Sequence, residues 1–244
     1  MNIIKAGLLS LLLTASGGAS ADTGAKEIRI ATLEHDTPQV NAAIIVMTEI
    51  YKRIGYDMTI VRFPGKRSLV EANLGTTDGE LMRIESIEKH YPNLVRVPYV
   101  IGRLIAVALV RKGQPKVSRL SELVGKRVGI LRGVEYTEIV TKHHDRQILN
   151  SVDSLFNSLL RERVDVILFP VLDVQAYIKS HGLENEIDIG DQPIVDLPLY
   201  HYLHKDSQAI VDTLAEEMLR MTKSGELDKL SRQTEKSQYS LIEK

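Results

Sequence analysis

Strand-like and helix-like segments alternate along the chain, and this alternation constrains the fold more than any single motif. Short apolar or alternating runs predict strands at 27–33, 58–63, 77–81, 104–110, 126–131, 164–169 and 198–203. Amphipathic or capped segments predict helices at 40–53, 68–74, 118–124, 135–142, 154–161, 173–180 and 206–223. Because consecutive βαβ units align their strands in parallel, the pattern predicts an α/β protein whose mostly parallel sheets are flanked by helices.

A polar break interrupts this rhythm near the middle of the chain. Residues 111–115, Arg-Lys-Gly-Gln-Pro, end the buried strand before them, and the βα pattern restarts at about Lys126. The restart indicates a second α/β unit inserted into the first. We therefore predict two lobes, one formed by 26–110 plus 200–244 and the other by 111–199.

The first residues have the composition of an export signal. Lys5 precedes an apolar run at 6–13, and the small residues at 19–21, Ala-Ser-Ala, stand before Asp22. The apolar run is about half of the roughly 20 residues that span a bilayer. We therefore expect 1–21 to be a cleaved signal peptide and the mature protein to be periplasmic. The absence of cysteine excludes a lipid anchor on that residue.

Composition excludes several classes of partner and chemistry. The chain has 31 basic and 32 acidic residues, a net charge of −1, which is too near neutral to favour nucleic acid or an anionic membrane. Without cysteine there are no disulfides, no thiolate catalysis and no zinc–thiolate site. We expect a monomer that binds a small molecule and needs no cofactor.

No motif for a known chemistry is present in the sequence. It has no glycine-rich phosphate loop, no nucleophile elbow and no zinc-protease motif. His143 and His144 are adjacent on a predicted helix, where their side chains point about 100° apart and chelate poorly. His201 and His204 lie three apart on a predicted strand and so face opposite sides. We expect no catalytic residue and no metal site.

Arginines at the ends of predicted strands are more informative. Arg67 follows a Pro-Gly turn, Arg83 follows a short strand, and Arg132 stands between a strand and a helix, next to Gly133. Ligands of open α/β sheets gather at the carboxyl ends of strands, and a guanidinium there matches a carboxylate or phosphate. Glu34 ends the first strand and could hold a cationic group. The predicted ligand-binding residues are Glu34, Arg67, Arg83, Arg132, Tyr136 and Asp173.

The order of segments resembles the family-3 extracytoplasmic solute-binding proteins, which include the amino-acid receptors of ABC importers. The matching stretches are 27–32 (EIRIAT), 63–69 (FPGKRSL), 77–83 (TDGELMR), 123–133 (LVGKRVGILRG), 163–168 (RVDVIL) and 198–205 (PLYHYLHK). The resemblance implies a two-lobed, type II periplasmic-binding fold. It also implies two crossover strands, with hinges near 110–111 and 197–200, and a ligand trapped on closure.

The chain departs from this family at the expected ligand residues. Where the amino-acid receptors carry Gly-Thr or Gly-Ser, this chain has Gly133 followed by Val134. Where they place an Asp directly after a later strand, this chain has Pro170, and Asp173 comes three residues later. Arg83 is the candidate for the arginine that clamps a carboxylate. The resemblance therefore implies the fold and a solute-binding role, and it describes a divergent branch.

Three functional classes fit this sequence. The first is a solute-binding protein that delivers an anionic or zwitterionic, amino-acid-like solute to an ABC transporter permease. The second is a periplasmic dehydratase-like enzyme on the same scaffold, with Glu34, Glu80 or Glu135 as general acid. The third is a sensory accessory protein that passes its ligand-bound state to a membrane receptor.

Overall fold

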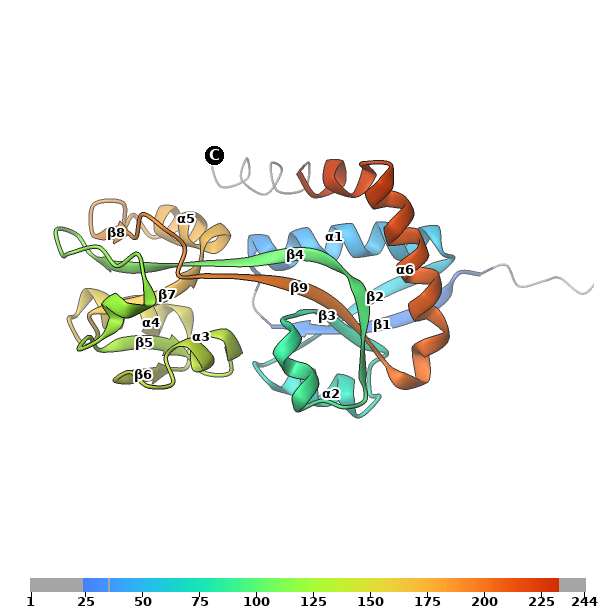
Figure 1. Ribbon diagram of the computed structural model, residues 1–244, viewed down its shortest axis with the longest axis horizontal. Helices are drawn as coiled ribbons and strands as arrows, with labels where there is room; N and C mark the ends of the chain where they lie inside the picture. Colours follow the sequence, from blue (N-terminus) through green and yellow to red (C-terminus); the bar gives the residue numbers. More distant parts are fainter. Residues whose placement is uncertain (1–23, 35, 233–244) are drawn as a thin grey trace, which may run out of the picture.

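The computed structural model describes residues 24–34 and 36–232, and it shows two α/β lobes joined by two long strands (Figure 1). Lobe 1 contains β1 (Lys26–Leu33), α1 (Pro38–Arg53), β2 (Tyr56–Phe63), α2 (Arg67–Asn73), β3 (Gly79–Arg83), the 3₁₀ helix η1 (Glu85–Lys89) and α6 (Gln208–Lys223). Lobe 2 contains the 3₁₀ helix η2 (Leu120–Leu123), β5 (Val128–Leu131), α3 (Glu135–Val140), β6 (Arg146–Leu149), α4 (Val152–Leu160), β7 (Val166–Pro170), α5 (Val171–Ser180) and β8 (Ile187–Ile189). The joining strands are β4 (Leu94–Arg111) and β9 (Val195–His204).

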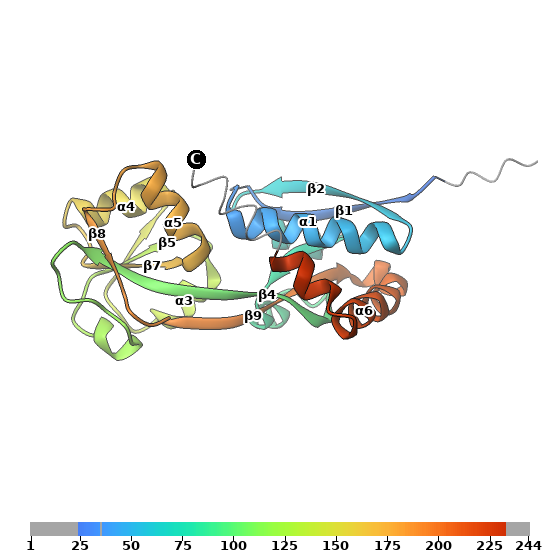
Figure 2. The same cartoon turned by 90° about the horizontal axis from the view of Figure 1, so that it is seen from above.

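The sheet order explains how two lobes share one connected set of strands. Along the sheet the order is β2-β1-β3-β9-β4-β7-β5-β6, with β8 paired to β4. Within the lobes β1 pairs in parallel with β2 and β3, and β5 pairs in parallel with β6 and β7. The pairs that involve β4 or β9 are antiparallel. The crossover strands thus insert antiparallel pairs between two parallel sets, as Figure 2 shows from above.

Local sequence sets the bounds of α1, the helix of lobe 1 whose first turn lines the cleft. Thr37 is its N-cap and accepts a hydrogen bond from the Val40 N–H at 3.2 Å, and Pro38 occupies the first turn. Met47 and Tyr51 lie on its fully buried face. The helix is followed by Gly55 at φ +82°, a conformation that favours glycine.

Each lobe has its own apolar core. In lobe 1, residues of β1, α1 and α6 pack together, among them Ile30, Met47 and Met218. In lobe 2, residues of β7, α4 and α5 form one cluster, and residues of β5 and β7 form another on the opposite face. Val97 of β4 packs in the first core, whereas Leu109 of the same strand packs in the second. Because β4 and β9 contribute to both lobes, the boundaries at 110–111 and 199–200 stay a prediction.

Several elements differ from the predicted ones. The joining strand β4 begins at Leu94 rather than at residue 104, and its pairing with β9 shifts register between Arg96 and Gly102. The strands β6 and β8 were not predicted, and η2 is a short 3₁₀ helix where an α-helix was expected over 118–124. The two strands give little signal in the sequence, because β6 is mostly exposed and β8 has only three residues.

The predicted signal peptide, 1–21, lies outside the described residues. Over 24–34 and 36–232 no helix is long and apolar enough to cross a bilayer.

Candidate ligand-binding cleft

A cleft of about 600 Å³ lies between the two lobes. Lobe 1 contributes residues from the end of β1, the start of α1, the loop before α2 and the end of β3, and lobe 2 contributes α3 and the ends of β5 and β7. Leu104 of β4 and Leu199 of β9 complete the wall at the crossover. The cleft therefore forms at the carboxyl ends of β1, β3, β5 and β7, the position expected for an α/β ligand site.

The two lobes touch each other across the mouth of this cleft. Lys66 Nζ lies 2.6 Å from Glu138 Oε2, and Ser86 Oγ donates to Glu135 Oε1 at 3.0 Å. A Cβ on Gly133, whose φ is +78°, would lie 3.3 Å from the Lys66 backbone nitrogen. Glycine at 133 therefore serves both the backbone conformation and the close approach of the two loops. These contacts describe a closed arrangement of the lobes.

Arg83 lines the cleft from the end of β3 and is held from behind. Its Nη2 lies 2.9 Å from Glu80 Oε1 and donates to Ser68 Oγ at 2.6 Å. Residues three apart on a regular strand face opposite sides, but the pairing of β3 with β9 is irregular between Glu80 and Arg83. This irregularity lets both side chains meet. Both contacts use Nη2, and Arg83 Nε has no hydrogen-bond partner among the described residues.

Glu80 is a fully buried carboxyl behind the cleft. Its exposed fraction is 0%, and burial raises its pKa to about 7 although Arg83 pulls the pKa down. Loss of water around the charged form is the larger effect. Glu80 is not itself among the residues that line the cleft. Its contact with Arg83 therefore acts on the cleft only through the guanidinium.

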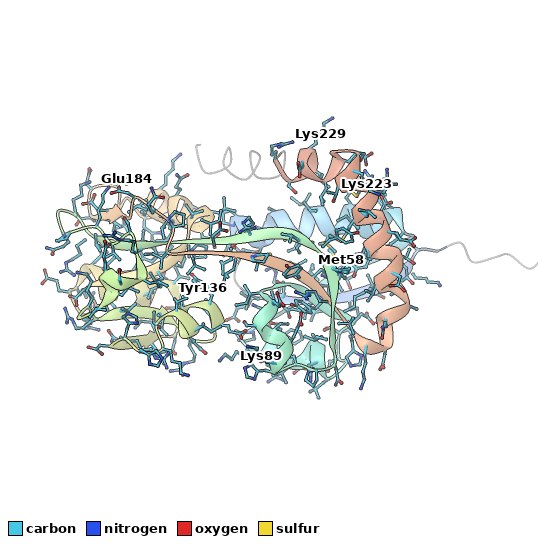
Figure 3. The ribbon with its side chains drawn as sticks, in the orientation of Figure 1. Met58, Lys89, Tyr136, Glu184, Lys223 and Lys229 are labelled. Atoms are coloured by element: carbon cyan, nitrogen blue, oxygen red, sulfur yellow. The ribbon has the colours of Figure 1, made fainter. Side chains whose placement is uncertain are left out.

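Asp173 and Tyr136 line the cleft from lobe 2. Asp173, in the first turn of α5, is 8% exposed, and burial raises its pKa to about 6. The nearby Gln39 backbone and Thr37 side chain, both from lobe 1, oppose that rise in pKa. Asp173 Oδ1 has no partner among the described residues. Tyr136 lies on α3 (Figure 3) and lines the cleft. Burial, with a smaller contribution from Asp173, raises its pKa far above the usual value.

The other three predicted site residues lie outside the lining of this cleft. Arg67 begins α2 with its side chain 67% exposed and pairs with Glu71 at 3.0 Å. Arg132 is exposed, and its Nε donates to Asn150 Oδ1 at 2.9 Å. Glu34 is exposed at the end of β1, where its N–H donates to the Phe63 carbonyl. The structure thus brings Arg83, Tyr136 and Asp173 to one cleft and leaves Glu34, Arg67 and Arg132 beside it.

Several lining residues escaped sequence reasoning. The apolar side chains of the wall have the same strand and helix spacing as core residues, so no signal separates them from the core. They include Leu33, Val40, Leu69, Met82, Ile84, Leu104, Val134, Phe169 and Leu199. Lys66 could have been found, because it stands in the same turn as Arg67 and follows Gly65.

His201 has the surroundings of a structural residue. His201 is fully buried, its Nε2 lies 2.7 Å from the Tyr51 hydroxyl, and its Nδ1 lies 2.9 Å from the Leu81 carbonyl. Burial lowers its pKa to about 4. Within the described ranges, no group of three or more His, Asp or Glu side chains is arranged to hold a metal ion.

Comparisons with solved structures define the fold class. The chain has the type II periplasmic-binding fold. An ancestral arginine-binding protein bound to arginine is 17% identical, with a TM-score of 0.70 over 85% of this chain and 97% of that chain. The GluR0 ligand-binding core in complex with L-glutamate is 13% identical, with a TM-score of 0.73 over 86% and 98%. An amino-acid ABC transporter substrate-binding protein from Streptococcus pneumoniae, bound to L-arginine, is 16% identical, with a TM-score of 0.69 over 87% and 95%.

Comparisons of the sequence do not assign the chain to a family. No family model matches the chain. An uncharacterized protein of Shewanella oneidensis is 23% identical over 204 residues, which cover 80% of this chain and 76% of that protein. At these identities the likeness shows the fold alone.

Proposed function

We propose that this protein is a periplasmic solute-binding protein. It captures a small anionic or zwitterionic solute between its lobes by hinge closure and delivers it to a membrane transporter. The observation that carries the proposal is the closed cleft itself, bridged by Lys66–Glu138 and Ser86–Glu135 and lined from both lobes. A site that is complete only when both lobes contribute makes affinity depend on closure.

Arg83 is the residue we assign to the acidic group of the solute. Its Nη2 is already held by Glu80 and Ser68, which fixes the plane of the guanidinium. The remaining N–H groups can then meet a carboxylate in the paired geometry that arginine favours. Asp173, on the opposite lobe, offers an unpartnered oxygen to a donor such as an ammonium group.

Export and delivery follow from two further features. The predicted signal peptide at 1–21 directs the chain out of the cytoplasm, and the fold is shared with substrate-binding proteins of amino-acid ABC transporters. A sensory role uses the same closure and differs only in the membrane partner. Amino-acid receptors supply the first set of compounds to test, because the neighbours in complex with arginine and L-glutamate share this architecture.

The test combines a thermal-shift screen with solution scattering on the mature protein. The probes are the common L-amino acids, dicarboxylates and small peptides. We expect a compound that binds at one-to-one stoichiometry, raises Tm and lowers the radius of gyration, since a ligand that binds only the folded closed form stabilises it. Arg83→Ala should abolish the shift, and Arg132→Ala, an exposed arginine outside the cleft, should keep it. Binding that is unchanged in Arg83→Ala, or that leaves the radius of gyration unchanged, would contradict the proposal.

A further inference from the structure

The wall of the cleft is mostly apolar, which sets it apart from a site built around one charged ligand. Val40, Leu69 and Met82 contribute from lobe 1, and Val134 and Phe169 from lobe 2. Two further leucines lie at the crossover strands. Such walls bind the apolar body of a ligand, because transfer of apolar surface out of water is favourable in proportion to its area.

Four of the charged side chains that line the cleft have partners within the protein. Lys66 pairs with Glu138, Arg83 with Glu80, and Glu135 accepts from Ser86 Oγ. A ligand is therefore not needed to neutralise these groups. Five buried side-chain atoms lack a hydrogen-bond partner among the described residues: Glu80 Oε1 and Oε2, His144 Nδ1, Arg83 Nε and Asp173 Oδ1. The last two, one donor and one acceptor, belong to residues that line the cleft. They match a single polar head rather than a ligand that is charged along its length.

The volume of the cleft also favours a ligand with a sizeable apolar body. With the lobes in contact the cleft stays partly open to solvent and measures about 600 Å³, roughly four times the 150 Å³ cavity that takes up one benzene molecule. This volume corresponds to a ligand of roughly 20 non-hydrogen atoms. A single amino acid leaves much of that volume unfilled, and unfilled apolar walls forfeit contact energy.

From this geometry we infer that the ligand is an amphipathic molecule larger than one amino acid. It has an aromatic or acyl body against the apolar walls and one acidic head, with a neighbouring N–H donor, between Arg83 and Asp173. The inference rests on the proposed function and narrows its ligand class. A hydrophobic dipeptide or an N-acyl amino acid has this chemistry.

The experiment uses 1-anilinonaphthalene-8-sulfonate as the probe, because it combines an aromatic body, an acidic head and an N–H group at the required size. We expect one-to-one binding to the folded protein, displaced by phenylalanyl-phenylalanine and much less by arginine. Val134→Trp fills the cleft and should weaken probe binding about tenfold or more.

Val124→Trp is the matched control, since Val124 is 76% exposed and does not line the cleft. It should leave probe binding within about twofold, as expected for an exposed site away from the wall. Thermal unfolding of both variants verifies that they fold. Equal effects of the two variants, or absence of one-to-one binding, would overturn the inference. A third outcome is that free amino acids bind and close the lobes, whereas the probe and the dipeptide do not. This outcome would overturn the inferred ligand class but leave the proposed function standing. If no compound closes the lobes, both fail.

Discussion

Two ion pairs at the cleft differ in their surroundings and in what they do. Glu80 and Arg83 belong to one lobe, and their side chains are 1% and 15% exposed. Glu138 and Lys66 belong to different lobes, and theirs are 29% and 51% exposed. Removal of one partner of a buried ion pair is costly, because the other charge is left buried without water or a counter-charge. When an exposed ion pair separates, water solvates both charges, so the cost is small. The first pair can therefore fix a side chain permanently, and the second can open and close with the hinge.

The largest expected effect comes from breaking the buried pair. Arg83→Ala leaves Glu80 buried without a cation, and we expect it to lower the free energy of unfolding by about 3 kcal/mol. The loss is limited because the Glu80 carboxyl, with a pKa already about 7, takes up a proton when its partner is removed. Urea denaturation at pH 7 measures it.

Arg132→Ala is the control for this change, because that side chain is exposed and, within the described residues, donates to Asn150 Oδ1. It should shift the free energy of unfolding by less than about 0.5 kcal/mol. Adding Glu80→Gln to Arg83→Ala should restore part of the loss, since a neutral amide is cheaper to bury than a carboxylate. A double variant no more stable than Arg83→Ala would show that packing of the guanidinium, not charge, is decisive.

The second effect is a pH dependence of stability due to Glu80. Its pKa in the folded protein, about 7, exceeds the ordinary value of 4.5, so the folded state holds the proton more tightly than the unfolded state. The contribution of Glu80 thus favours folding at low pH and is lost as the pH rises from about 4.5 through about 7. At roughly 1.4 kcal/mol per pKa unit, this gives a loss of about 1–3 kcal/mol across the window.

Glu80→Gln isolates this contribution from the other carboxylates. We expect the difference in unfolding free energy between the variant and the unchanged protein to vary with pH in that window and to be flat above it. Chemical denaturation at pH 4.5, 6 and 8 gives the three points. A difference that is the same at all three would mean that Glu80 has an ordinary pKa.

A smaller effect is expected at Thr37, which serves both lobes. Its hydroxyl caps α1 within lobe 1, and the Thr37 side chain also lowers the pKa of the Asp173 carboxyl of lobe 2. Thr37→Ala should lower the unfolding free energy by about 1 kcal/mol, the usual cost of a lost N-cap. Thr37→Ser keeps the hydroxyl and should recover most of it. Equal losses in the two variants would point to the methyl group instead.

The smallest effect on stability is expected at the pair between the lobes. Lys66→Ala should change the unfolding free energy by less than about 1 kcal/mol, because the pair is exposed and screened by salt. It should nevertheless reduce the decrease in radius of gyration that solution scattering detects on ligand binding, since one of the contacts that hold the closed lobes together is lost. A stability loss as large as that of Arg83→Ala would remove the difference between the two pairs.

Local sequence was sufficient to predict most elements and the fold class. The strand that became β1, the helix at 40–53 and the alternation that restarts after 111–115 are properties of short segments. Side-chain period and capping chemistry act over a few residues and so are visible in the sequence. Arg83, Tyr136 and Asp173 were identified by their positions at the ends of strands or starts of helices, and the structure places them at the cleft.

Tertiary structure decided the rest of the site. Arg67 and Arg132 had the same sequence signal as Arg83, yet each turned to a polar neighbour, Glu71 or Asn150, outside the cleft lining. Three features of the site depend on segments that are distant in the chain. They are the irregular pairing of β3 with β9 beside Glu80 and Arg83, the close approach of Gly133 to Lys66, and the apolar wall formed by both lobes. Sequence spacing fixes which face of an element a residue occupies. Only the packing of elements against one another determines what that face meets.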